Sequence, residues 1–310
     1  MSTLVALLSA LSGVFFSCIG ICVRIGTGRR LHELHVTGIM AGIGALFFSL
    51  RASHTLVVVP GDVLAISLVA GVTQYVTMYV VRLALRLGPL TPMWCAVMLG
   101  FVPVVIYSAV AFGERLTPWH WAAVTAAVGC VLFASTLSGE KGDRPPPGPR
   151  TARSLTYGLT LLGVFALNCV LSVAVKHLAM QPDGQGGNLM LRYGDAFRAW
   201  VYLTIFLCIA ADQAVFRRRV EQPAAVLLTL GTLAAGGSIG GLWLLSICAS
   251  APAASVFVIN AMASIVFTSA VGTLLFRERR SWRWYTTVCL GLLAALLSQA
   301  PAIARSVGVR

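Results

Sequence analysis

Three charged residues interrupt an apolar stretch of the chain: Arg192, Asp195 and Arg198. Residues three apart lie on one face of a helix, so Asp195 can pair with either arginine. In a bilayer, a charge near the centre costs roughly 3 kcal/mol and needs a partner inside the protein. Two interpretations stay open. One is a structural ion pair. The other is that Asp195 holds the Arg198 guanidinium toward a cavity, where it binds a carboxylate or phosphate through two hydrogen bonds.

Uncharged polar residues inside apolar segments form a second set of candidates. They are Gln74, Tyr75, Tyr79, Asn168, Asn260 and Ser264. The first three lie on one side of a predicted helix over 63–85, and the last two are one helical turn apart. An unsatisfied polar group in lipid costs several kcal/mol, so these side chains must face protein or water. They either bond between helices or border a substrate cavity, and we predict the cavity.

The sequence gives little support for a metal site, a cofactor site or a catalytic site. His32 and His35 are three apart, but no carboxylate or thiolate set surrounds them. The eight cysteines, all inside predicted apolar helices, are expected to act as small hydrophobic residues. The chain has no GxxxxGK[ST] loop for binding a nucleoside triphosphate. A membrane-embedded enzyme would need several convergent acidic, histidine or cysteine residues, and only Asp195 lies at that depth. We therefore expect that the protein binds no metal and no cofactor, and that it is not an enzyme.

The elements that carry these residues are predicted to be transmembrane helices. The chain has 310 residues, of which 58% are hydrophobic and 11% charged, and its mean hydropathy is +0.86. Runs of about 20 apolar residues, long enough to cross a bilayer, recur along its length. The first run has neither a basic start nor a cleavage site and is expected to stay uncleaved. The predicted helices cover 3–23, 34–50, 63–85, 92–112, 117–137, 154–175, 190–211, 224–248, 252–276 and 284–300.

A polar, Pro- and Gly-rich segment over 139–153 is the long linker of the chain. It separates five predicted helices in 1–138 from five in 154–310. The two halves resemble each other: 83–121 and 246–284 share the order of a polar turn, an apolar run and an acidic-basic turn flanked by tryptophans. Such an echo indicates two copies of one helical unit.

The net charge of +13 does not indicate nucleic-acid binding, because the cations are scattered between apolar segments. Loops after the odd-numbered helices hold 16 of the 23 Lys and Arg residues, and the opposite side holds five. Basic loops favour the cytoplasm, so the linker and the Arg217–Arg219 turn are predicted to be cytoplasmic. The basic loops follow the first and third helices of one half but the second and fourth of the other. This opposite bias at equivalent loops is what an inverted repeat requires.

The motifs LGPLTP with FGERLTPWHW, and SAPAASVFV with RERRSWRW, resemble the EamA-like branch of the drug/metabolite transporter superfamily. The order and duplication of these motifs carry the resemblance, which covers nearly the whole chain. The chain departs from the family in two respects. Family members generally keep both termini in the cytoplasm, whereas the loop charges of this chain predict both termini outside it. Relatives often carry tryptophan where this chain has Ser12-Gly13.

The resemblance implies an all-α integral membrane protein of ten helices in an inverted five-plus-five repeat. It implies a secondary transporter of the inner or plasma membrane that exports a small polar metabolite through a central cavity. The fifth and tenth helices would be peripheral. The chain lacks the membrane glutamate of proton-coupled multidrug exporters, which leaves neutral, zwitterionic or anionic substrates. A channel or a lipid-linked-sugar flippase of the same fold stays an alternative, and so does a homodimer.

Overall fold

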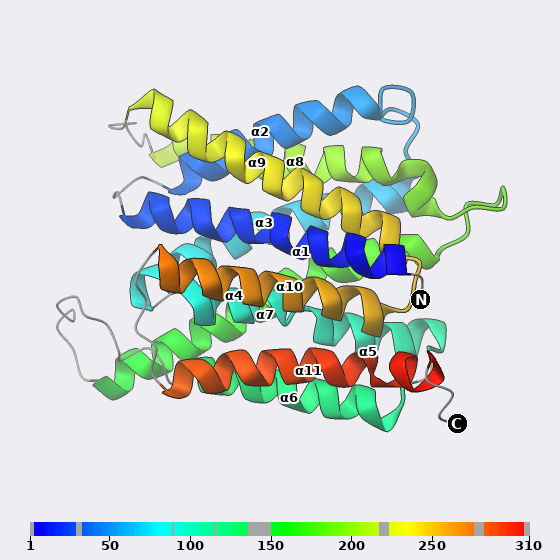
Figure 1. Ribbon diagram of the computed structural model, residues 1–310. Helices are drawn as coiled ribbons and strands as arrows, with labels where there is room; N and C mark the ends of the chain where they lie inside the picture. The colour runs from blue at the N-terminus through cyan, green and yellow to red at the C-terminus, as the bar shows by residue number, and fades with distance from the viewer. Residues whose placement is uncertain are drawn as a thin grey trace.

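The computed structural model describes residues 3–28, 33–88, 90–114, 116–135, 150–216, 223–275 and 282–306. Within these ranges the chain is built from α-helices (Figure 1). Pro182 and Asn188 also form an isolated antiparallel β-bridge. The helices are α1 (Thr3–Gly28), α2 (Glu33–Arg51), α3 (Gly61–Leu87), α4 (Leu90–Met98), α5 (Phe101–Phe112), α6 (Pro118–Ser135), α7 (Arg150–Met180), α8 (Leu189–Phe216), α9 (Ala224–Cys248), α10 (Ala253–Leu274) and α11 (Trp282–Ser306).

Eight segments of the described chain are long and apolar enough to cross a membrane. They are Leu4–Gly26, Leu34–Arg51, Gly61–Leu87, Pro92–Phe112, Leu155–Met180, Leu189–Val215, Ala224–Cys248 and Val256–Leu274. In addition, α11 contains a shorter apolar segment, Trp284–Ala294. Since a run of about 20 apolar residues spans the hydrocarbon core, the prediction of an all-α, multi-pass membrane protein is confirmed at this level.

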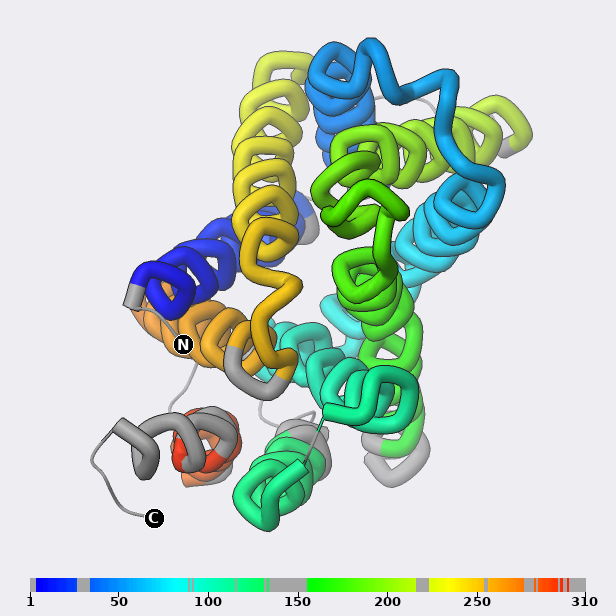
Figure 2. The backbone as a smooth tube through the Cα atoms, turned by 90° about the vertical axis from the view of Figure 1, so that its right-hand side faces the viewer, coloured from blue at the N-terminus to red at the C-terminus, as the bar shows by residue number. Residues whose placement is uncertain are grey.

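The helices lie side by side along one common direction (Figure 1). Helix α1 packs against α9 and α10, α2 against α8 and α9, and α3 against α7 and α8. Helices α4 and α5 contact α7 and α10. The remaining two, α6 and α11, pack against each other and lie at one edge of the bundle in Figure 2. The bundle therefore has a central group of helices and a peripheral pair.

The fourth predicted helix, 92–112, is wrong as one continuous element, because the structure breaks it into α4 and α5. At the break the backbone bonds shorten to i→i+3, with Gly100 N–H donating to Val97 O at 3.2 Å and Val102 N–H to Leu99 O at 3.0 Å. Proline is the residue that most often interrupts a helix, and the sequence has one at Pro103. Pro103 instead lies in the first turn of α5, where a missing N–H costs nothing.

Small residues allow the helices to approach closely, as the Ser9, Gly13 and Ser17 spacing predicts. A Cβ on Gly13 would lie 2.1 Å from the carbonyl oxygen of Asn260, so α1 and α10 touch backbone to backbone. A Cβ on Gly237 would lie 2.5 Å from Phe15 O, which marks a similar approach of α9 to α1. Helix α1 is thus held between α9 and α10.

Several predicted segments have other bounds or lie outside the described residues. Helix α7 begins at Arg150 and ends at Met180, so it is longer than the predicted 154–175 at both ends. The rest of the predicted linker, the Arg217–Arg219 turn, His32 and the RERR turn at 277–280 fall outside the described ranges.

Candidate functional site

A cavity of about 100 Å³ lies at the centre of the bundle. Its lining residues come from α1, α2, α3, α4, α5, α7, α8, α9 and α10. Neither α6 nor α11 contributes a lining residue within the described chain. This arrangement agrees with the peripheral place that the resemblance gives to the fifth and tenth predicted helices.

The cavity wall is apolar and aromatic, with a few uncharged polar groups. Its aromatic residues and methionines are Phe16, Trp94, Phe101, Tyr202, Phe257, Met40, Met78 and Met98. Its other polar residues are Thr37, Gln74, Thr77, Asn168, Ser172, Ser238 and Asn260. Among the lining residues that the structure describes, none carries a formal charge. A ligand in this cavity meets aromatic faces, sulfur atoms and a small set of hydrogen-bonding groups.

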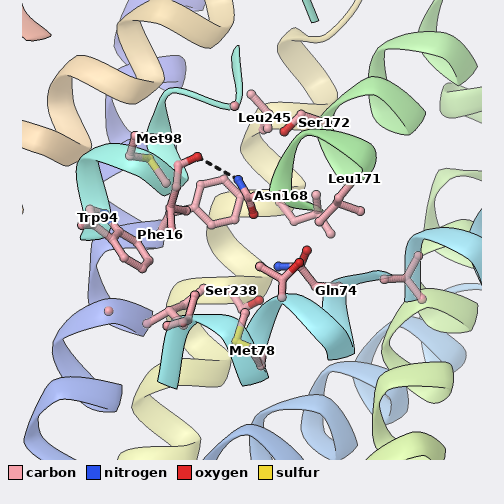
Figure 3. A pocket seen from close by; sticks show the side chains of 18 of the residues that line it. Phe16, Gln74, Met78, Trp94, Met98, Asn168, Leu171, Ser172, Ser238 and Leu245 are labelled. Atoms are coloured by element: carbon pink, nitrogen blue, oxygen red, sulfur yellow. Dashed lines mark hydrogen bonds between the residues drawn. The ribbon is translucent and has the colours of Figure 1, made fainter. Parts of the chain in front are cut away.

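Asn168 joins the cavity to the break between α4 and α5. Its Nδ2 donates to the carbonyl oxygen of Val97 at 2.8 Å (Figure 3). In an unbroken helix that carbonyl would accept the N–H of Phe101. At Gly100 a Cβ would lie 3.3 Å from Asn168 Nδ2, so a small residue leaves room for the amide. The side chain of α7 therefore gives Val97 O a second donor beside the Gly100 N–H, which bonds it at 3.2 Å.

Gln74 approaches the same space from α3, on the other side of the cavity from Asn168 (Figure 3). Its Oε1 is buried and has no hydrogen-bond partner within the described chain. A buried acceptor without a partner is costly, which makes it a candidate for contact with a ligand.

Asn260 lines the cavity from α10, whereas Ser264, one turn further along, is fully buried and is not a lining residue. The Ser264 hydroxyl accepts the indole N–H of Trp94 at 2.8 Å and lies 2.7 Å from Ser17 Oγ. Trp94 itself lines the cavity. In this structure Ser264 therefore orients a wall residue, and its predicted direct contact with substrate stays untested.

Tyr75 and Tyr79 share a helix with Gln74 but are not lining residues. The Tyr79 hydroxyl donates to Asp212 Oδ1 at 2.6 Å, which links α3 to α8. The Tyr75 ring packs edge-on against the Tyr79 ring, with centroids 5.3 Å apart. These contacts match the alternative of interhelical bonding, and a role of the two tyrosines in binding stays a prediction.

Arg198 and Asp195 pair as their spacing predicts, but they do so outside the cavity wall. The Asp195 carboxylate also binds Arg51 of α2 at 3.1 Å, a partner that the sequence analysis missed. The Arg198 guanidinium is 5% exposed, donates to Ser246 Oγ at 3.3 Å and lies 5.3 Å from the centroid of the Phe48 ring. These contacts match a structural ion pair. The prediction that Arg198 binds an anionic substrate is not supported by its place, and it stays untested.

A second buried ion pair was not predicted. The Lys176 ammonium is 0% exposed and lies 2.7 Å from Glu114 Oε1. It also donates to Ala251 O at 3.1 Å, while Glu114 Oε2 accepts the Ala253 N–H at 3.3 Å. The pair thus joins the end of α7 to the α5–α6 loop and the α9–α10 junction. The sequence offered a signal, because Glu114 belongs to one of the repeated turns.

The sequence analysis also missed the wall residues Tyr202 and Ser238, whose hydroxyl oxygens are 2.5 Å apart. Tyr202 is four positions after Arg198, and Ser238 lies in the glycine-dense segment of α9. Both residues lie near features that are visible in the sequence, but the sequence does not show that either side chain faces a cavity.

No group of three or more His, Cys, Asp and Glu side chains in the described ranges is arranged to hold a metal ion. The eight cysteines are free thiols. The site is therefore described by its apolar wall and its amide and hydroxyl groups.

No protein-family model and no curated protein matches the sequence. A solved structure described as "Crystal structure of protein" has a TM-score of 0.69 and 17% sequence identity, and the match covers 97% of this chain and 98% of that one. At this identity the likeness concerns the fold alone. The likeness in fold extends over nearly the whole of both chains.

Proposed function

We propose that this protein is a secondary transporter of the inner or plasma membrane that exports a small, uncharged and largely apolar metabolite by alternating access. One observation carries the proposal: an uncharged cavity lies at the centre of a multi-pass helical bundle, and helices from both halves of the chain line it. Midplane sites between two halves are typical of secondary transporters.

The packing supports a ten-helix inverted repeat of the EamA-like type. Counting α4 with α5 as one span, each helix of the first half has a counterpart five spans later. Helix α1 packs against α9 and α10, and its counterpart α7 packs against α3 and against α4 and α5. Likewise α2 packs against α9, and its counterpart α8 packs against α3. The contacts are the same after the two halves are exchanged, and α1 and α7 run in opposite directions (Figure 1).

The cavity changes the substrate class that we expect: the resemblance implies a small polar metabolite, whereas most of the lining residues are apolar. The absence of a membrane glutamate leaves neutral, zwitterionic and anionic metabolites as candidate substrates. A charged ligand would lose its hydration in a wall that offers no counter-charge, and burying an unpaired charge is strongly unfavourable. The aromatic and methionine wall instead favours an uncharged solute with a compact apolar body.

Counterflow in proteoliposomes tests this function. Vesicles are preloaded with pooled neutral metabolites, and the uptake of each labelled solute is followed. A transporter accelerates uptake when its substrate is present on the opposite side, whereas a channel does not. Scrambling of labelled lipid-linked sugar without counterflow would instead support the flippase alternative.

A pair of tryptophan variants links any transport to the cavity. Ser172→Trp places a large ring in the cavity wall and should abolish counterflow. Leu228→Trp, on a face of α9 where Leu228 is 55% exposed, makes a similar addition away from the cavity and should transport like the parent. Equal transport by the two variants would contradict the proposed role of the cavity.

A further inference from the structure

Two amides in the cavity wall have fixed orientations. A carbonyl oxygen can only accept a hydrogen bond, so the Asn168 amide must present Nδ2 to Val97 O, 2.8 Å away. Asn260 Nδ2 faces Ser9 O at 3.5 Å and Ser12 Oγ at 2.8 Å, and that hydroxyl donates its own proton to Gly241 O. In both side chains the nitrogen is held by backbone or hydroxyl oxygens. The amide oxygen is the group left over.

Two donors in the same cavity wall as these oxygens are already used within the protein. The structure gives neither Asn168 Oδ1 nor Asn260 Oδ1 a hydrogen-bond donor among the described residues. The Trp94 indole N–H is directed to Ser264 Oγ at 2.8 Å. The Thr77 hydroxyl bonds the carbonyl oxygen of Thr73 in its own helix at 2.8 Å. The Trp94 indole and the Thr77 hydroxyl are thus directed to other acceptors, and the two asparagine oxygens are left for a ligand.

Gln74 adds an acceptor from the opposite side. Its Oε1 is buried without a partner in the described chain, and Figure 3 shows its amide and that of Asn168 approaching one space from α3 and α7. An unpartnered buried acceptor gains more from a new donor than an exposed one, because it has already lost its water.

We propose that the cavity selects an uncharged ligand that donates an N–H or O–H hydrogen bond from a compact apolar ring. Asn168 Oδ1 is the fixed acceptor, with Gln74 across the cavity and Asn260 beside them. The inference rests on the proposed function and names its substrate class. A site built to receive a donor rejects an analogue without one, because an acceptor such as the buried Gln74 Oε1 then stays unpaired. The volume of about 100 Å³ is below the 150 Å³ or so that accommodates benzene, which indicates a small ring.

Pyrrole and furan form a matched pair for the test, since they differ in one ring atom and only pyrrole has a donor. Binding is measured by ligand-observed NMR titration to the full chain in lipid nanodiscs, with empty nanodiscs subtracted. Pyrrole should bind about tenfold more tightly than furan. Pyrrole-2-carboxylate, the same ring with an anionic group, should not displace pyrrole.

Variants assign the preference to the amides. Asn168→Leu keeps the size of the side chain and removes its oxygen, and the preference for pyrrole should fall to near one. Gln74→Met is the second variant, because Gln74 Oε1 has no hydrogen-bond partner among the described residues, and it should lower the preference in the same direction. Thr229→Val, at an exposed position of α9 whose hydroxyl bonds Ala225 O, is the control and should keep the parent's preference.

Equal affinities of the parent for pyrrole and furan would overturn the donor inference and leave the cavity as an apolar binding site. An unchanged preference in both Asn168→Leu and Gln74→Met would overturn the assignment to these amides. Failure of both rings to bind would contradict this inference, while counterflow of a larger neutral solute in the same preparation would still support the proposed function.

Discussion

Charged side chains buried within the bundle are the exception in this protein, because most of its charged residues lie at helix ends. Lys176 is 0% exposed and has Glu114 as its counter-charge. Asp195 lies between Arg51 and Arg198. In both cases the charges are paired and make further hydrogen bonds to neighbouring helices. This is the condition under which a bundle interior tolerates ions.

Glu114→Gln should lower the free energy of unfolding by about 3 kcal/mol or more, because the buried Lys176 ammonium loses its counter-charge. The double variant Lys176→Met/Glu114→Gln should recover most of that loss, since no unpaired charge remains. Denaturation in mixed micelles, followed by tryptophan fluorescence, measures both. A double variant as unstable as Glu114→Gln alone would show that the pair is not the cause.

Arg198→Lys tests which of the two interpretations of helix α8 is right. Lysine keeps the charge but loses the bond from Nε to Ser246 and the planar contact with Phe48. For a structural residue, the variant should lose about 1–2 kcal/mol of stability and transport a neutral substrate with unchanged affinity. The measurements are unfolding in mixed micelles and counterflow. Parent-like stability together with weaker substrate affinity would favour the alternative of an anion-binding arginine.

At the scale of elements, the break between α4 and α5 matters most to the site. It directs the Val97 carbonyl to Asn168 and brings Trp94, Met98 and Phe101 to the cavity. Gly100 permits the close approach of α7, and the side chain of Asn168 adds a donor to Val97 O beside the i→i+3 bond from Gly100. A local interruption of one helix is thus coupled to a polar residue of another.

Gly100→Val and Pro103→Ala should differ in their effects on this break. A valine at Gly100 would crowd Val97 O and Asn168 Nδ2, which lie 3.2 and 3.3 Å from the added Cβ, and should cost about 1–3 kcal/mol. Pro103→Ala should cost less than 1 kcal/mol, because a first-turn N–H has no helical acceptor to regain. Unfolding in mixed micelles compares the two. A larger cost at Pro103 would mean that proline, not glycine, maintains the break.

At the scale of the whole molecule, helices from 1–138 and from 154–310 pack against each other and line one cavity, as the proposed repeat requires. The polypeptide between them and the Arg217–Arg219 turn carry the basic residues on which the predicted orientation depends. Arg150 and Arg153 lie in the first turn of α7, whereas residues 139–149 and the Arg217–Arg219 turn fall outside the described part of the structure.

Reporter fusions at Pro146 and at Arg218 should both report a cytoplasmic location, because basic loops are retained on that side. A phosphatase that is active only outside the cytoplasm and a fluorescent protein that matures inside it make a complementary pair of reporters. Periplasmic signals at both sites would reverse the orientation and keep the architecture. Opposite signals at the two sites would contradict the ten-helix count.

The sequence by itself determined that the chain crosses a membrane repeatedly, since hydrophobicity and length are local properties that bilayer thickness converts into helices. It also identified Asn168, Gln74 and Asn260 as polar residues in need of partners. Only the tertiary structure decided where those partners lie. Arg51 and Asp195 are 144 positions apart, and Asn168 and Val97 are 71 apart. Helix periodicity fixes the face of a residue within its own helix but not which helix packs against that face, so the cavity depends on the packing of the whole bundle.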